Sequence, residues 1–132
     1  MTPAFWCIII SILFNYLLAG IGGFLTVRQT GRFDIAKPRI QERELTGAAA
    51  RVRAAQANGW EVTPVFASCV FIAHFAGVPE TQTALPAYLF VLSRALYMVC
   101  YACKLNPWRT IIFVVGLFAC SWLIKMAIVY SG

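Results

Sequence analysis

A long run without charged side chains opens the chain and sets the strongest limit on its fold. Residues 2 to 27, TPAFWCIIISILFNYLLAGIGGFLTV, contain no Asp, Glu, Lys or Arg. The run exceeds the roughly 20 apolar residues that an α-helix needs to cross a bilayer. A cleaved signal peptide normally has a basic start, a shorter apolar core and a small-residue cleavage site, none of which is convincing here. The run therefore predicts a retained transmembrane helix.

The composition extends this prediction to the whole chain. Of its 132 residues, 61% are hydrophobic and 12% are charged, and the mean hydropathy is +0.75, which is too apolar for an ordinary soluble domain. Three further apolar stretches follow, and their long continuous runs are typical of helices in lipid. We expect an all-α integral membrane protein, a single domain over 1–132 built as a four-transmembrane-helix bundle. The expected helices cover about 3–28, 47–78, 84–104 and 107–130.

The connections between these helices predict their orientation. The stretches at 77–81 and 104–107 are short, so the helices that they join are antiparallel neighbours. The long connection at about 28–50 is rich in Arg and Lys, whereas the 77–81 connection has Glu80 and no base. The positive-inside rule therefore places the long basic loop in the cytoplasm and both termini outside. Within the second helix, Pro64 is expected to weaken or bend the chain.

The net charge of +6 raises the question of nucleic-acid binding. The bases of the long loop are interleaved with acids, and the aromatic residues lie mainly inside the spans. Membrane topology and contact with anionic lipid headgroups explain the charge more simply. We expect membrane lipids as partners, and no nucleic acid.

Ionisable residues at membrane depth are costly and usually face a bundle interior, a partner or a water-filled cavity. One interpretation is a buried ion pair between Glu61 and Arg94. A surplus of arginines near the cytoplasmic ends favours another interpretation, an anionic ligand with more than one carboxylate. Helical spacing gives two polar stripes, Arg51, Asn58 and Glu61 on the second helix and Arg94, Tyr97 and Tyr101 on the third, and the further arginines are Arg28, Arg53 and Arg109.

The residues of these stripes resemble the MAPEG family, the membrane-associated proteins in eicosanoid and glutathione metabolism. The family pattern on the second helix has an arginine-rich lead and then Asn, Glu, Pro and Phe, matched here by Arg51, Asn58, Glu61, Pro64 and Phe66. The third helix carries SRALYMVCY and the fourth opens with NPWRT, as in the family. The resemblance covers essentially the whole chain. It is closest to the uncharacterised bacterial branch, whose second helix also reads like AAQANGWE.

The resemblance implies a homotrimer in a bacterial inner membrane, with glutathione bound as a co-substrate between subunits on the cytoplasmic side. Its thiolate would attack a lipophilic electrophile, or reduce a lipid hydroperoxide, that enters between the first and fourth helices. Arg109 is the implied catalytic residue, because a nearby cation lowers a thiol pKa and favours the nucleophilic thiolate. The implied glutathione-binding residues are Arg28, Arg51, Asn58, Glu61, Arg94, Tyr97 and Tyr101.

Three positions depart from the family pattern. Ala57 stands where the prostaglandin synthase type has an arginine, Arg53 is one position away from another expected arginine, and Phe113 replaces a tyrosine near the thiol site. One branch of the family binds lipid without glutathione chemistry. A noncatalytic membrane lipid-binding or scaffold protein is therefore the alternative function, although the presence of Arg109 favours a glutathione transferase or peroxidase.

Other chemistries have weaker support. Cys100 and Cys103 form a CxxC, as in quinone-linked thiol oxidases of four helices, but they lie toward the reducing cytoplasm. We interpret the cysteines as packing residues. A small multidrug exporter would use a membrane glutamate to bind cations, but the arginines around Glu61 would repel a cationic drug. His74 has no second histidine or acidic neighbour, so we expect no metal site.

Overall fold

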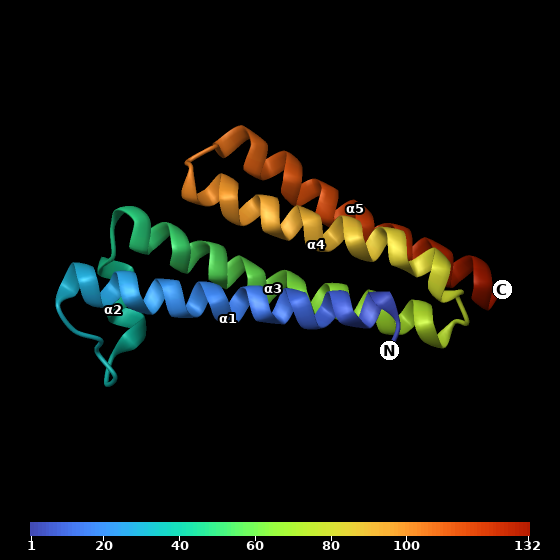
Figure 1. Ribbon diagram of the computed structural model, residues 1–132, viewed down its shortest axis with the longest axis horizontal. Helices are drawn as coiled ribbons and strands as arrows, with labels where there is room; N and C mark the ends of the chain where they lie inside the picture. Colours follow the sequence, from blue (N-terminus) through green and yellow to red (C-terminus); the bar gives the residue numbers. More distant parts are fainter.

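The computed structural model describes all residues from 1 to 132 as helices joined by short turns and loops, with no strand. The all-α prediction is therefore confirmed. A short helix lies beside the ends of α1 and α3, within the stretch expected to be a loop (Figure 1). The helices are α1 (Pro3–Thr30), α2 (Pro38–Glu44), α3 (Gly47–Phe75), α4 (Glu80–Ala102) and α5 (Asn106–Ser131).

Local chemistry explains where α1 begins and ends. Thr2 precedes the helix, and its Oγ1 accepts a 3.3 Å hydrogen bond from the N–H of Phe5. Gly31 follows the helix in the left-handed conformation, with φ of 81°, and its N–H donates to the carbonyl of Val27. By contrast, Pro64 lies inside α3 without ending it, because the flanking turns are held by packing against neighbouring helices.

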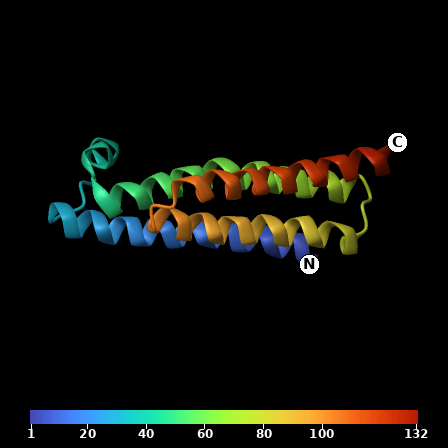
Figure 2. The ribbon, with the colours of Figure 1, turned by 90° about the horizontal axis from the view of Figure 1, so that it is seen from above.

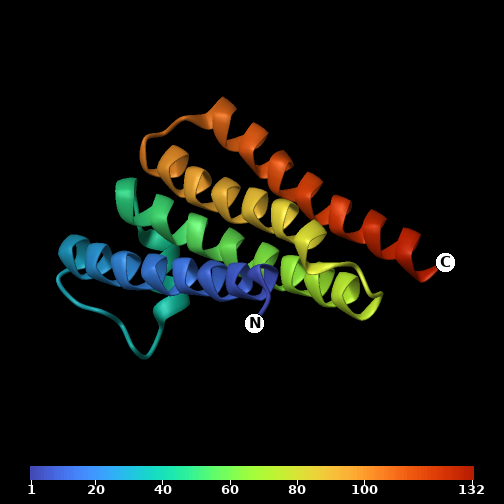
Figure 3. The same cartoon turned by 45° about the vertical axis from the view of Figure 1, so that its right-hand side comes forward.

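The four long helices pack as two antiparallel pairs. In Figure 1, α1 lies against α3 and α4 lies against α5, and Figure 2 shows α1 and α4 in one layer with α3 and α5 in the other. The helices α3 and α4 also pack against each other across the bundle, whereas α1 and α5 lie on opposite corners. The two pairs are close where the chain termini lie and diverge toward the α4–α5 turn (Figures 1 and 3).

The antiparallel packing gives the bundle two chemically different ends. At the basic end, α1 and α4 finish while α3 and α5 begin, which gathers Arg28, Arg51, Arg53 and Arg109. At the opposite, terminal end lie both chain termini (Figure 1). The basic end therefore brings together arginines from α1, α3 and α5 that are far apart in the sequence.

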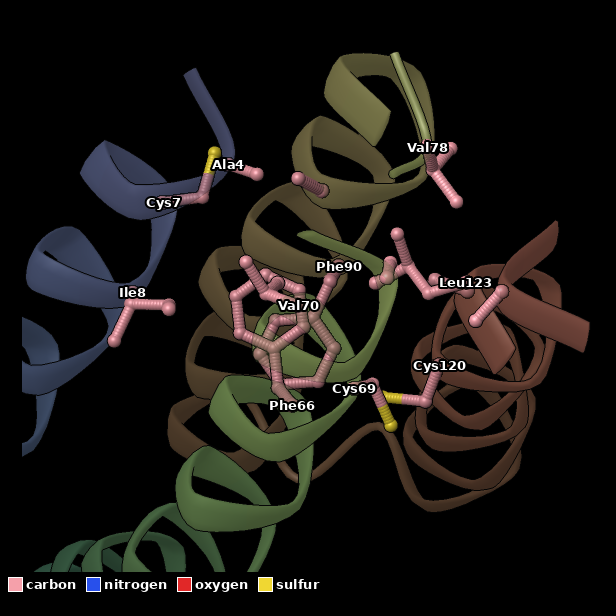
Figure 4. Packing of buried hydrophobic residues seen from close by; sticks show 14 residues of the cluster. Ala4, Cys7, Ile8, Phe66, Cys69, Val70, Val78, Phe90, Cys120 and Leu123 are labelled. Atoms are coloured by element: carbon pink, nitrogen blue, oxygen red, sulfur yellow. The ribbon is translucent and has the colours of Figure 1, made fainter. Parts of the chain in front are cut away.

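The apolar core is concentrated at the terminal end, where it holds fourteen buried residues, Val78 from the α3–α4 turn and the others from the four long helices (Figure 4). The rings of Phe66 and Phe90 stack there with centroids 3.9 Å apart and planes 7° from parallel. At the basic end, only Leu18, Ala55 and Tyr97 form a buried cluster. The terminal end is therefore the packed scaffold of the fold.

Two glycines let the helices approach closely near the middle of the bundle. A Cβ at Gly59 on α3 would collide with Oδ1 of Asn15 on α1, and a Cβ at Gly116 on α5 would lie 2.9 Å from Oγ of Ser93 on α4. Nδ2 of Asn15 donates a 2.9 Å hydrogen bond to Oγ1 of Thr63. Small residues and interhelical hydrogen bonds of this kind are typical of membrane helices.

Three helices, α1, α4 and α5, are long and apolar enough to cross a membrane. The helix α3 has 29 residues, but it is not among them, because polar side chains such as Asn58 and Glu61 lower its hydropathy. The structure thus agrees with an integral membrane protein, and hydropathy accounts for three of the four spans that the sequence predicted.

Candidate functional site

Two arginines and two tyrosines form a continuous series of contacts at the basic end. Cζ of Arg94 lies 4.4 Å from the ring centroid of Tyr97, and Cζ of Arg109 lies 4.7 Å from that of Tyr101. The two tyrosine rings are 5.6 Å apart, centroid to centroid. Cations over aromatic faces are attracted by the electrons of the ring. The fold therefore brings together four of the residues predicted for the site, from α4 and α5.

Arg94 is the most tightly enclosed charge in the protein, with 6% of its surface exposed. Its guanidinium makes no ion pair, because the one ion pair of the structure joins Arg53 to Glu42. The face of Tyr97 makes the one cation–π contact with this charge. A buried cation without a counter-charge is costly. The surroundings of Arg94 are therefore suited to an anion.

The alternative of a buried ion pair between Glu61 and Arg94 is wrong for the single chain. Glu61 is exposed on α3 and has no ion-pair partner. Glu61 nevertheless lies about one turn from Asn58 along α3, and Oδ1 of Asn58 is buried without a hydrogen-bond partner. Glu61 thus stands beside the cluster, open to a ligand or to another copy of the chain.

Arg51 and Tyr101 meet at a cavity of about 280 Å³ between α1, α3 and α4. The rest of the lining is apolar and includes Leu18 and Met98. Nε of Arg51 is buried without a hydrogen-bond partner, and so is Oδ1 of Asn58, two turns further along α3. Buried polar atoms in proteins are usually satisfied. These two atoms therefore mark places where a bound group could complete the hydrogen bonding.

Arg28 and Arg53 lie outside the cluster of arginines and tyrosines on α4 and α5. Arg28 is exposed in the last turn of α1 and makes no ion pair. Nη1 of Arg53 lies 3.5 Å from Oε1 of Glu42 and donates a 3.1 Å hydrogen bond to Oε1 of Gln56. The side chain of Arg53 also covers Gly22. Arg53 therefore ties α2 and α1 to α3, although its Nε, like that of Arg51, is buried without a hydrogen-bond partner.

Sequence reasoning missed polar residues that lie on the other side of Arg94. Ser11, Asn15 and Thr63 line a small cavity together with Arg94, and the hydrogen bond between Asn15 and Thr63 closes it. One signal was present, because Asn15 is the single amide side chain in the charge-free run at 2–27. The structure also shows where the two residues that depart from the family pattern, Ala57 and Phe113, lie. Ala57 is exposed, and the ring of Phe113 lies 6.5 Å from that of Tyr97.

The whole-chain comparison agrees with this arrangement of four long helices and a basic end. A family model described as "MAPEG family" matches residues 3–129, which include all the residues of the candidate site. No curated protein and no solved structure matches the chain. The family includes glutathione transferases and peroxidases as well as noncatalytic members. Because the match covers nearly its entire length, this chain belongs to the MAPEG family of membrane proteins.

Proposed function

We propose that the protein is a glutathione-dependent membrane transferase or peroxidase whose site is the cluster at the basic end. The observation that carries the proposal is Arg94, buried without a counter-charge and joined through two tyrosines to Arg109. Glutathione has two carboxylates, which arginines bind through charge-assisted hydrogen bonds. The unpartnered atoms of Arg51 and Asn58 supply further hydrogen-bonding capacity nearby.

Each residue has a role in this proposal that follows from its chemistry. Arg109 is catalytic, because its cation favours the thiolate form of the substrate. Glu61 is the one carboxylate beside the cluster and would bind the amino group of the tripeptide. The arginines would bind its carboxylates, while the tyrosines hold the guanidinium groups and offer hydroxyls. The binding residues proposed are Arg28, Arg51, Asn58, Glu61, Arg94, Tyr97 and Tyr101.

The thiolate would attack an electrophilic carbon, either by addition or by substitution with departure of a leaving group. With a hydroperoxide, two glutathiones would become a disulfide while the hydroperoxide is reduced to an alcohol and water. The protein would hold the sulfur beside Arg109 and keep a lipophilic reactant in the bilayer. Because α1 and α5 lie on opposite corners of one chain, the reactant would enter between α1 of one subunit and α5 of its neighbour. The apolar surface there gives weak selectivity. Concentrating both reactants at one place contributes to the rate by proximity.

The proposal includes a homotrimer of subunits with four spans each. A helix of 29 residues is about 43 Å long, which exceeds the roughly 30 Å hydrocarbon core. The helix α3 can therefore cross the membrane with Arg51 and Arg53 outside the hydrocarbon. Trp60, 39% exposed, and Glu61 lie on its open surface, where a neighbouring subunit would cover them and complete the site.

The proposed orientation follows the distribution of basic residues. The α1–α3 connection and the α4–α5 turn would face the cytoplasm, where glutathione is abundant, and both termini would lie outside. A bacterial inner membrane is the proposed location. The basic residues of the connection would then contact anionic headgroups.

A noncatalytic lipid-binding or scaffold protein is the second candidate. The apolar lining of the 280 Å³ cavity favours it, because Arg51 is the one charged residue there. An acyl chain would fit such surroundings. This candidate needs no role for Arg109, and that difference separates the two functions experimentally.

The test is an ultraviolet difference titration of detergent-solubilised protein with glutathione, which records thiolate absorbance. We expect a saturable signal in the wild type that disappears in Arg109→Ala. Lys104→Ala is the matched control, because it removes an exposed cation from the same α4–α5 turn. It should keep the signal.

Two results would contradict the proposal. A folded wild type with no thiolate signal would favour the lipid-binding candidate. A signal that persists in Arg109→Ala would remove the proposed catalytic role of that residue. Glu61→Gln should also weaken glutathione binding, and an unchanged affinity would exclude Glu61 from the site.

A further inference from the structure

Two cysteines from different helices face each other at the terminal end, far from the candidate glutathione site. Cys69 on α3 and Cys120 on α5 are 7% and 6% exposed, and both are free thiols. Their side chains lie side by side in Figure 4, and both residues line the same groove between α3 and α5. Cys7, Cys100 and Cys103 have no such partner. One covalent bond could therefore join α3 to α5.

Both thiols belong to the wall of a groove of about 570 Å³ between α3 and α5. The groove is lined mainly by aliphatic side chains such as Val65, Leu117 and Ile124, on helices that are exposed along this side. The cysteines are thus buried from water but open to an apolar molecule that occupies the groove.

Lys125 is the one charged residue of this groove. It is exposed, it has no ion-pair partner, and it lies five positions beyond Cys120 on α5. A single ammonium group in the wall of an otherwise uncharged, mainly aliphatic groove complements an amphiphile with one anionic head and an apolar chain. A long-chain carboxylate has this combination. With the carboxylate at Lys125, its chain would pass the two thiols.

We propose that Cys69 and Cys120 form a redox-active dithiol that reduces a fatty-acid hydroperoxide bound in this groove with its carboxylate at Lys125. One thiol, as the thiolate, attacks the terminal oxygen of the peroxide. The O–O bond breaks, the alcohol leaves with a proton, and a sulfenic acid remains. The second thiol attacks that sulfur, so that an S–S bond forms and water leaves. In sum, two thiols and one hydroperoxide give one disulfide, one alcohol and one water.

This reaction goes beyond the proposed glutathione chemistry and does not depend on it. Lys125 and Arg109 lie about 24 Å apart along α5, at 1.5 Å per residue. The dithiol reaction in the groove and glutathione binding at the basic cluster can therefore be tested independently. The disulfide would also tie α3 to α5, the two helices that form the walls of the groove.

The experiment treats the purified, glutathione-free protein in detergent with a long-chain fatty-acid hydroperoxide. Free thiols are then counted after denaturation, and the cross-linked peptides are identified by mass spectrometry. We expect two thiols lost per chain, one Cys69–Cys120 disulfide and one equivalent of the alcohol. Cys69→Ala and Cys120→Ala should each prevent the cross-link, whereas Cys7→Ala and Arg109→Ala should retain it.

The role of Lys125 is tested with a second oxidant. Lys125→Gln should slow oxidation by the fatty-acid hydroperoxide about tenfold, the effect of losing one charge-assisted contact. It should leave the rate with uncharged cumene hydroperoxide unchanged, and Lys104→Gln should change neither rate. Five free thiols after treatment of the folded protein, or a disulfide between other cysteines, would overturn the proposal. Equal slowing with both oxidants would overturn the role given to Lys125.

Discussion

The two ends of the bundle are built from the same four helices but are packed differently. At the terminal end, fourteen buried residues fill the space between the helices, and Phe66 stacks on Phe90. At the basic end, three buried residues form the cluster around Tyr97, and a cavity of about 280 Å³ remains. Buried polar atoms without partners are found on α3 toward this end. The terminal end is closely packed and apolar, whereas the basic end contains buried polar atoms that lack hydrogen-bond partners.

The difference indicates a division of labour between stability and binding. A site with unpartnered charges costs stability, so the structure must be held together elsewhere. The terminal end can provide this because its residues are apolar and closely packed. Substitutions at the terminal end should therefore lower the free energy of unfolding, and substitutions at the basic end should mainly change the affinity for the ligand.

The largest expected effect comes from breaking the packed end. Phe66→Ala removes a fully buried ring from the stack with Phe90 and leaves a cavity between α3 and α4. The free energy of unfolding should fall by about 3–5 kcal/mol. Denaturant titration in detergent, followed by circular dichroism, measures the change.

The matched control is Phe75→Ala, which removes a ring that is 83% exposed. It should change the free energy of unfolding by less than about 0.5 kcal/mol. If both variants lose similar stability, the terminal end is not the scaffold and the division of labour is wrong.

The second prediction is that replacing Arg94 should raise the stability of the ligand-free protein but weaken glutathione binding. Arg94→Met removes a buried cation that has no counter-charge in the ligand-free chain. By analogy with buried ion pairs replaced by apolar residues, the ligand-free protein should gain roughly 1–4 kcal/mol. Glutathione should then no longer raise the melting temperature. Thermal unfolding with and without glutathione measures both quantities.

Arg32→Met is the control for this variant, because it removes an exposed arginine from the α1–α2 connection. It should change neither quantity. A strong loss of stability in ligand-free Arg94→Met would mean that the protein itself compensates the charge, and the contrast between the two ends would be weaker than we infer.

The sequence predicted the helices and much of the basic cluster, because these features depend on neighbours along the chain. Charge-free runs indicate spans, and the spacing of Arg94, Tyr97 and Tyr101 places them on one face of α4. The short helix α2 was missed because its residues are polar and resemble a loop. The basic loop expected over 28–50 therefore contains a helical turn held by tertiary contacts.

Contacts between helices were harder to predict. A span that is apolar all round gives little indication of its rotation about its own axis. The sequence therefore could not show that Asn15 bonds to Thr63, that Cys69 lies beside Cys120, or that Glu61 is exposed and forms no ion pair with Arg94. Each of these contacts depends on how two helices face each other.

A smaller effect tests the boundary between the two ends. In Gly59→Ala, the new Cβ would collide with Oδ1 of Asn15, so the hydrogen bond between Asn15 and Thr63 must be lost or α1 must move. The expected cost is about 1–3 kcal/mol, less the helix propensity gained by replacing glycine.

Gly20→Ala is the matched control, because nothing lies within 4 Å of the Cβ that it adds to α1. It should stabilise the protein by up to about 1 kcal/mol. The double variant Asn15→Ala with Gly59→Ala should cost less than the sum of its single changes. Simple additivity would show that the two residues are not in contact.

The smallest effect concerns the one ion pair of the structure, which contrasts with the unpaired charge of Arg94. Glu42 is 43% exposed and its Oε1 lies 3.5 Å from Nη1 of Arg53, so water and salt screen the attraction. Glu42→Gln should cost about 0.5 kcal/mol or less. Gln41→Ala should loosen α2 more, because the Gln41 side chain makes hydrogen bonds to Asp34, Thr30 and Arg32. Hydrogen exchange of the α2 amides ranks the two variants, and the reverse ranking would mean that charge rather than hydrogen bonding holds α2 at the basic end.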